Sequence, residues 1–313
     1  MLTTELPNLE RFSVSKTRGF LSDEPPLTAF ADPHFHPWDL LITSLPSLVS
    51  TRAIRREIQT LPLLDASRLS TDLEHQRAYV VLAFLIHAYV WTGPSEAENK
   101  PEPVVPPQLA EPFLYVCEKV GLQPVLSYAG LCIWNWQAVD SITREENGFF
   151  SLEQLKSVGS FTGSRGEDAF NHVPVLVEAE GGPLVYLLLS AIQNGDSESL
   201  TSALITAEVT FTRMTRHLPK LYPVLDADMF YNTLRPLLAG GKDLPPRGGV
   251  VFQKTDGTEE AVACIGGSAA QSSLFQFLDV VLGTEHKAGP GVQRTLFEVS
   301  QRHNHSQSTI IAE

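Results

Sequence analysis

A continuous apolar run, AYVVLAFLIHAYVW at residues 78–91, places the strongest constraint on how this chain can fold. A helix that is hydrophobic on all sides must be surrounded by other parts of the protein or by lipid. The run is shorter than the roughly 20 apolar residues that span a bilayer, and it contains His87. We therefore expect a buried helix over 70–92, capped by Ser70 or Thr71, with His87 hydrogen-bonded in the core.

Helical patterns also dominate the rest of the chain. Two short ones lie within 39–62, a third covers about 108–120, and another begins at Asp226 or Asp228 and ends at Leu238. Apolar residues recur at spacings of three and four along a further segment: Leu200, Leu204, Ala207, Phe211, Met214 and Leu218. One hairpin is expected in GGVVFQKTDGTEEAVACI, with TDGT as its turn. No repeated strand–helix–strand pattern occurs, so we predict an all-α fold.

The length of the chain allows more than one domain. Its 313 residues with 43% hydrophobic content are enough for one large or two medium cores. Residues 141–168 are polar and rich in Gly and Ser, which is typical of a connection between domains. We therefore predict an N-terminal domain of residues 1–155 and a C-terminal domain of residues 156–313.

Charge and cysteine content exclude several function classes. The formal charge of −13, from 36 acidic and 23 basic residues, argues against nucleic-acid binding because an acidic surface repels phosphates. No Lys/Arg run indicates a membrane-surface patch, and no signal-peptide pattern opens the sequence. Cys117, Cys132 and Cys264 are few and far apart, so we expect buried thiols in a reducing compartment. The resulting prediction is a cytoplasmic monomer with no nucleic-acid or membrane partner.

Common catalytic signatures are absent from the sequence. The dinucleotide-binding, P-loop, serine-hydrolase and zinc-protease motifs do not occur. His34, His36 and Asp39 lie close together in PHFHPWD, but a tetrahedral metal site needs three or four rigidly held ligands. We therefore favour a packing or surface role for these residues over a metal-dependent hydrolase.

Three other stretches suggest a ligand site, each with a structural alternative. In MFYNTLRPLL, Phe230 and Arg235 lie about 140° apart on an α-helix, and Arg235 needs either an anionic partner or a route to solvent. The aromatic stretch LSYAGLCIWNWQ, residues 126–137, lines a pocket or fills a core. In IGGSAAQSSLFQFLDVVLG, residues 265–283, small residues precede an apolar helix. They form a flexible turn with a cap, or they let a large flat ligand lie against the backbone.

Taken together, these stretches are similar to the indoleamine 2,3-dioxygenase family in its fungal form. The resemblance runs from about residue 10 to about residue 298 and is carried by six blocks in the same order. They are RGFL at 18–21, AYVW at 88–91, SYAGLCIWNW at 127–136, SFTGSRGEDAFNHVPVLVEAEGGP at 160–183, MFYNTLR at 229–235 and GGSAAQSSLFQFLDVVLG at 266–283.

The resemblance implies a haem enzyme with two helical domains and heme b, with its iron, between them. The small N-terminal domain would contribute the distal pocket, and the large domain would bind haem and substrate. The implied reaction opens the indole ring of L-tryptophan with O₂ and gives N-formylkynurenine, a step of tryptophan catabolism by the kynurenine pathway. The ferrous haem would activate O₂ while the protein orients the indole, so no catalytic acid or base is expected.

The resemblance also implies roles for individual residues. Phe230 would pack on the indole ring, and Arg235 would pair with the substrate carboxylate in bidentate geometry. The predicted substrate contacts are Tyr128, Phe170, Phe230, Arg235, Gly267, Ser268 and Ala269. The predicted haem contacts are Leu131, Cys132, Gly267 and Ser268. Pro174 stands where animal members carry a distal serine, and no role is assigned to the nearby His172.

The C-terminal residues depart from the family pattern. In the family a histidine on a late helix holds the haem iron, whereas the tail SQRHNHSQSTIIAE is unlike the family's continuation. We therefore expect the proximal histidine to be absent and the larger domain to be incomplete, with neither His303 nor His305 replacing the ligand. The alternative prediction is an inactive, truncated family member that binds partners or indoles without haem.

Overall fold

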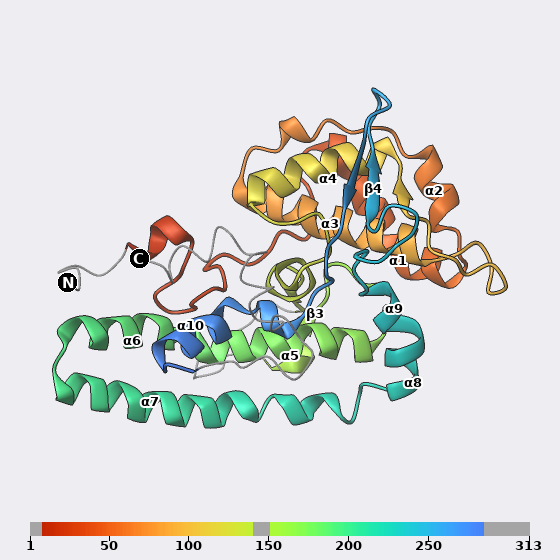
Figure 1. The fold of residues 1–313 in the computed structure, drawn as a ribbon. Helices are drawn as coiled ribbons and strands as arrows, with labels where there is room; N and C mark the ends of the chain where they lie inside the picture. The colour runs from red at the N-terminus through yellow and green to blue at the C-terminus, as the bar shows by residue number, and fades with distance from the viewer. Residues whose placement is uncertain (1–7, 140–150, 285–313) are drawn as a thin grey trace.

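The computed structural model describes residues 8–139 and 151–284. Helices make up most of this part of the chain, which confirms the predicted all-α class, and two small sheets accompany them. The main helices are α1 (His36–Ser50), α2 (Ile54–Thr60), α3 (Asp72–Trp91), α4 (Pro107–Val120), α5 (Arg165–Gly181), α6 (Pro183–Asn194), α7 (Ser197–Thr215) and α10 (Ser273–Val281). Figure 1 shows α1 to α4 gathered in one body, with α5, α6, α7 and α10 lying beside it as a second layer.

Two strands from the C-terminal half of the chain, at residues 250–262, lie against the body formed by α1 to α4. The predicted hairpin is present as β4 (Val250–Gln253) and β5 (Glu259–Val262), joined in antiparallel register. β4 also pairs in parallel with β1 (Val104–Val105), a contact that the sequence analysis did not predict. A second pair joins β2 (Gln137–Ala138) to β3 (Leu155–Lys156). Residues 250–253 therefore lie beside β1 and α4, which are distant from them in sequence (Figure 1).

Two short π-helical turns interrupt the helical regions. The first, η4 (Ala129–Ile133), is closed by a hydrogen bond from the Trp134 N–H to the Ala129 carbonyl. The second, η7 (Phe230–Leu234), lies between α8 (Ala227–Met229) and α9 (Arg235–Leu237). The predicted helix that begins at Asp226 therefore exists, but its middle is a π turn. Turns of this kind occur most often at functional sites.

The long apolar helix is buried as predicted. Thr71 and Glu74 form a reciprocal capping box at the start of α3, and residues 77–90 of α3 are buried. His87 accepts a hydrogen bond from the Leu126 N–H at 2.9 Å, and its Nδ1 lies 2.8 Å from the Leu237 carbonyl. Burial lowers the pKa of His87 to about 4, so the neutral ring fills this position. The prediction of a hydrogen-bonded core histidine is confirmed.

Two hydrophobic cores form, and each takes residues from both halves of the sequence. The first core surrounds α3 and includes Phe252 of β4 together with Leu234 and Leu237 near α9. The second core lies between α6, α7 and α10 and includes Phe20 from the N-terminal segment. Residues from after position 155 therefore pack in the first core, and residues from before it pack in the second core. The division into two domains at residue 155 stays a prediction.

The buried stripe of α7 differs from the predicted one. The buried residues are Ala203, Ala207, Thr210 and Met214, whereas Leu204 is 50% exposed. Leu218, the last member of the predicted stripe, lies beyond the helix end and is 54% exposed. The physical reason is that α7 packs against both α5 and α6, and small side chains permit a close approach of helices. Leu204 therefore lies outside the contact face, whereas Leu200 and Phe211 are partly buried and pack against the second core.

One stretch has the length and composition of a membrane span. Residues 165–194, which comprise α5 and α6, are long and apolar enough by those two criteria. However, 61% of the most apolar window is buried inside the protein. This burial is typical of a core helix rather than of a lipid-facing one.

Candidate functional site

A cavity of about 440 Å³ lies between α5, α7, η4 and the loop that precedes α10. Its lining is almost entirely apolar, and within the described ranges 8–139 and 151–284 no Lys, Arg, Asp, Glu or His belongs to it. The lining residues are Tyr128, Leu131, Cys132, Phe170, Val173, Pro174, Val177, Phe211, Met214, Thr215, Leu218, Leu221, Gly267, Ser268, Ala269 and Phe275. Such a cavity suits a large apolar ligand whose orientation is fixed by a few polar groups.

The structure brings most of the predicted site residues together around this cavity. Tyr128, Leu131, Cys132, Phe170, Gly267, Ser268 and Ala269 all line it. They come from three segments that are distant in sequence, namely η4, α5 and the loop at 266–272. Phe230 and Arg235 do not belong to the described lining.

The first wall is the π turn η4 and the residue before it. Tyr128 is 6% exposed, and Leu131 and Cys132 are equally well buried. Gly130 permits the turn to pack closely, because a Cβ there would lie 2.8 Å from the Tyr79 ring. Burial raises the pKa of the Cys132 thiol, so this group is a neutral thiol near pH 7.

The small-residue loop at 266–272 forms the second wall, and its glycines are needed for backbone packing. A Cβ at Gly266 would collide with the Leu238 carbonyl oxygen. A Cβ at Gly267 would lie 3.0 Å from the Leu126 carbonyl oxygen. We expected glycine here because a ligand lies against the backbone, but the contacts that require it are with other protein segments. The residues Gly267–Ala269 nevertheless line the cavity.

A buried polar network stands behind both walls. The Tyr128 hydroxyl donates to Glu178 Oε1 at 3.0 Å, and the Ser272 hydroxyl donates to the same oxygen at 2.6 Å. Gln271 Oε1 accepts from the Tyr128 N–H at 2.9 Å and from the Ser268 N–H at 3.3 Å. Burial raises the pKa of Glu178 to about 7, against the smaller effects of the two hydroxyl donors.

Phe230 approaches the cavity indirectly. Its ring packs on the Phe170 ring with centroids 5.1 Å apart, and Phe170 lines the cavity. Arg235 is exposed, with its guanidinium carbon 5.2 Å from the centre of the Tyr231 ring. The predicted angle of 140° between Phe230 and Arg235 is wrong, because the Arg235 N–H bonds to the Phe230 carbonyl across the π turn. The two residues are therefore one turn apart.

Pro174 and His172 occupy different environments on α5. Pro174 lines the cavity at the position where animal members of the resembled family carry serine. His172 is fully buried and lies away from the lining, with Nε2 3.3 Å from the Ser157 hydroxyl and 3.4 Å from the Asn135 carbonyl. Burial lowers the pKa of His172. Its contacts give it a packing role.

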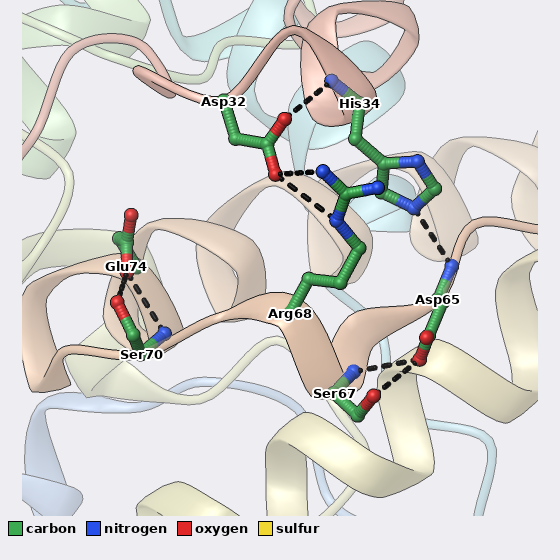
Figure 2. Close-up of polar contacts among 7 residues, drawn as sticks. All are labelled: Asp32, His34, Asp65, Ser67, Arg68, Ser70 and Glu74. Carbon is green, nitrogen blue, oxygen red and sulfur yellow. Dashed lines mark hydrogen bonds and ion pairs between the residues drawn. The ribbon is translucent and has the colours of Figure 1, made fainter.

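His34 and Asp39 of PHFHPWD contact residues from other segments of the chain. His34 Nε2 accepts a hydrogen bond from the Asp65 N–H at 2.9 Å, beside the ion pair of Asp32 with Arg68 (Figure 2). Asp39 pairs with the buried Arg77 of α3 at 2.7 Å. In the part of the chain that the structure describes, no group of three His, Cys, Asp or Glu side chains is arranged to hold a metal ion. His303 and His305 lie outside the described residues.

Several site residues were not identified from the sequence. Among the remaining lining residues are Val173, Val177, Phe211, Met214, Leu221 and Phe275, and their apolar character alone did not separate them from core residues. Glu178 offered a clearer signal, because an acid within the apolar run VPVLVEAE requires a polar partner inside the protein.

Comparison with known proteins places this site in a family. The family model for indoleamine 2,3-dioxygenase matches residues 8–310. The chain is 39% identical over 288 residues to the 6-hydroxytryptophan 2,3-dioxygenase of Fusarium equiseti, covering 90% of this chain and 68% of that protein. It is 34% identical over 286 residues to an indoleamine 2,3-dioxygenase of Aspergillus candidus, covering 89% and 69%. It is also 33% identical over 297 residues to a myoglobin of Haliotis diversicolor, covering 93% and 73%. The chain therefore belongs to the indoleamine 2,3-dioxygenase family.

Proposed function

We propose that this protein is a haem-dependent dioxygenase that opens the 2,3-bond of the indole ring of L-tryptophan with O₂ and releases N-formylkynurenine. Membership of a family of indole dioxygenases supports the reaction class. The observation that carries the proposal is the apolar cavity, whose lining includes the predicted residues of η4, α5 and the loop at 266–272. A cytoplasmic monomer is part of the same proposal, and the three cysteines are buried and unpaired.

The cavity lining fits the macrocycle of a haem in its chemistry. Leu131, Val173, Phe211 and Met214 offer broad apolar surfaces, which a porphyrin ring can contact in place of water. No histidine belongs to the lining within the described ranges. The described residues would therefore hold the ring by apolar contact with its faces.

The remaining steps fall to the side chains of this chain. Bound haem would supply the activation of O₂. The apolar walls would exclude water and hold the indole ring flat against Phe170, with Phe230 supporting that ring from behind. Arg235 forms no ion pair with any described residue, so its exposed guanidinium is free to bind a carboxylate. Orientation of the substrate, rather than proton transfer, is the proposed contribution of the protein.

The proposal is tested by turnover in a pair of matched variants. The purified protein is supplied with haem, a reductant, L-tryptophan and O₂, and N-formylkynurenine is measured by absorbance and mass. Ala269→Trp puts a large ring at the exposed rim of the cavity, whereas Ala263→Trp puts the same ring at an exposed position outside the lining. We expect Ala269→Trp to lose most of the turnover and Ala263→Trp to keep it. Equal loss in both variants, or no product from the parent protein, would contradict the proposal.

A ring-hydroxylated tryptophan is the second candidate substrate. The observation that favours it is the 39% identity to a 6-hydroxytryptophan 2,3-dioxygenase. The hydroxyl groups of Ser268 and Thr215 in the lining could pair with a hydroxyl on the indole ring. The ratio of kcat/KM for 6-hydroxytryptophan and L-tryptophan distinguishes the two substrates directly.

Oxygen binding without ring opening is the second candidate function, and the relative named myoglobin favours it. The two functions differ in the fate of O₂. A dioxygenase consumes one O₂ for each indole that disappears, whereas an oxygen-binding protein releases its O₂ when the pressure falls. Parallel measurement of O₂ and indole concentrations in one sealed sample therefore separates them.

A further inference from the structure

Glu178 ties together two of the walls that enclose the cavity. It lies on α5 and is 1% exposed. Its Oε1 accepts hydrogen bonds from Tyr128, in the η4 wall, and from Ser272, at the N-terminus of α10 directly after the small-residue loop. Three segments that are distant in sequence therefore meet at one oxygen atom.

The geometry around Glu178 fits a neutral carboxylic acid better than a carboxylate. Both hydrogen bonds go to Oε1, while Oε2 is buried without a hydrogen-bond partner among the described residues. An unpaired hydroxyl in such a place costs less free energy than an unpaired charged oxygen. A space of about 20 Å³ beside Glu178, Gln271 and Ser273 is large enough for one water molecule, which needs roughly 10–15 Å³.

Among the residues that the structure describes, no positive charge offsets a negative charge on Glu178. The titratable groups that face it from η4 and the residue before η4 are Cys132 and Tyr128, and burial raises the pKa of both, so they stay neutral near pH 7. Arg213 on α7 and His217, two residues after the end of α7, pair with Glu180 instead. From the side of α10 the hydroxyl of Ser272 is the contact. Loss of the Glu178 proton would therefore leave a buried anion held by two hydroxyl groups.

We propose that Glu178 is a positioning residue of the cavity: as a neutral acid it holds Tyr128 in the wall and Ser272 beneath the loop, and so sets how tightly the cavity binds an indole substrate. The identity of the substrate rests on the proposed function, whereas the coupling of Glu178 to Tyr128 does not. The neutral form is the competent form, because a buried anion would draw water between the two walls, even though it would accept stronger hydrogen bonds from Tyr128 and Ser272.

The proposal gives a definite pH dependence of binding. With a midpoint near 7, the fraction of neutral Glu178 falls about tenfold between pH 6 and pH 8. The apparent Kd of a ligand that needs the neutral form rises by the same factor. A carboxylic acid that served only as packing would leave the Kd unchanged over this range.

The first experiment follows the tyrosine and needs neither haem nor substrate. The ultraviolet difference spectrum of tyrosine is recorded between about pH 6 and about pH 8 in the parent protein, Glu178→Gln and Glu180→Gln. Glu180 is a matched control because it lies on the same helix but pairs with Arg213. We expect a tyrosine signal with a midpoint near 7 in the parent and in Glu180→Gln, and none in Glu178→Gln. A signal that survives in Glu178→Gln, or is missing from the parent, overturns the proposal.

The second experiment measures the Kd of L-tryptophan by calorimetry on the same three proteins, loaded with haem. We expect an increase of about tenfold from pH 6 to pH 8 in the parent and in Glu180→Gln, and a constant value in Glu178→Gln. The same increase in Glu178→Gln would refute the assignment. If the parent binds no L-tryptophan at any pH, the proposed function fails, and the tyrosine spectrum still decides the role of Glu178.

Discussion

Replacing Glu178 by Gln measures the energetic cost of a buried acid in the cavity wall. Burial raises the pKa of this acid from 4.5 to about 7. Between these values the folded chain keeps a proton that the unfolded chain has lost, so the stability of the fold decreases as the pH rises. Each pKa unit corresponds to about 1.4 kcal/mol. Glu178 alone should therefore remove about 3 kcal/mol of stability between about pH 4 and about pH 8.

The assay is urea denaturation at a series of pH values in parent and variant. Gln keeps an oxygen that accepts from Tyr128 and Ser272, but it cannot ionise. Other titrating groups contribute equally to both proteins, so they cancel in the difference between the two free energies of unfolding. We expect this difference to shift by about 3 kcal/mol in favour of Glu178→Gln as the pH rises through the window, with the largest change between pH 5 and pH 7.

The outcome that would refute this reasoning is a difference between parent and variant that stays constant with pH. It would mean that Glu178 ionises in the folded protein near the pH at which it ionises in the unfolded chain. The wall would then contain water or a compensating charge that the described contacts do not include.

Three further predictions follow from the packing. Gly266→Ala should destabilise the fold by roughly 2 kcal/mol or more, since its new Cβ meets the backbone of residue 238, and denaturation against the parent measures this loss. Arg235→Leu should weaken L-tryptophan binding at least several-fold. The free energy of unfolding should change by less than about 0.5 kcal/mol, because the side chain is exposed. An unchanged Kd for L-tryptophan would show that Arg235 does not bind the substrate. His87→Phe should cost roughly 2–4 kcal/mol in denaturation experiments, because two buried backbone groups lose their hydrogen-bond partners. A cost below about 0.5 kcal/mol would show that water replaces the ring.

Local signals explain which parts of the fold could be predicted. The apolar run at 78–91 together with the Thr71 cap specified α3, because an apolar run and a capping box depend on neighbouring residues alone. The turn TDGT likewise specified the hairpin of β4 and β5. The parallel contact of β4 with β1 joins residues far apart in sequence, and no local pattern encodes such a pairing.

The residues of the candidate site could be predicted where the sequence contains a block typical of the family. Tyr128, Phe170 and the loop of Gly267–Ala269 were identified from blocks of sequence, and the structure places them around one cavity. That a ligand requires the glycines stays a prediction; the structure adds a second reason for them, since backbone atoms of residues distant in sequence lie close to Gly266 and Gly267. The face of α7 was predicted in part: Ala207 and Met214 of the predicted stripe are buried, but the spacing of apolar residues could not show that Ala203 and Thr210 are buried as well.

The π turn η7, which lies between α8 and α9, gives the chain a place where its length can change without disturbing its packing. A π turn amounts to one residue inserted into an α-helix, so removal of one residue restores an α turn and leaves the flanking segments in register. A deletion of Thr233 within η7 should therefore preserve the fold. The same deletion at Thr206 in α7 would rotate everything that follows by about 100° and move Met214 out of the core. Single-codon deletions, which substitution libraries never sample, are thus a natural route by which a gene of this kind could reshape the segments beside its cavity.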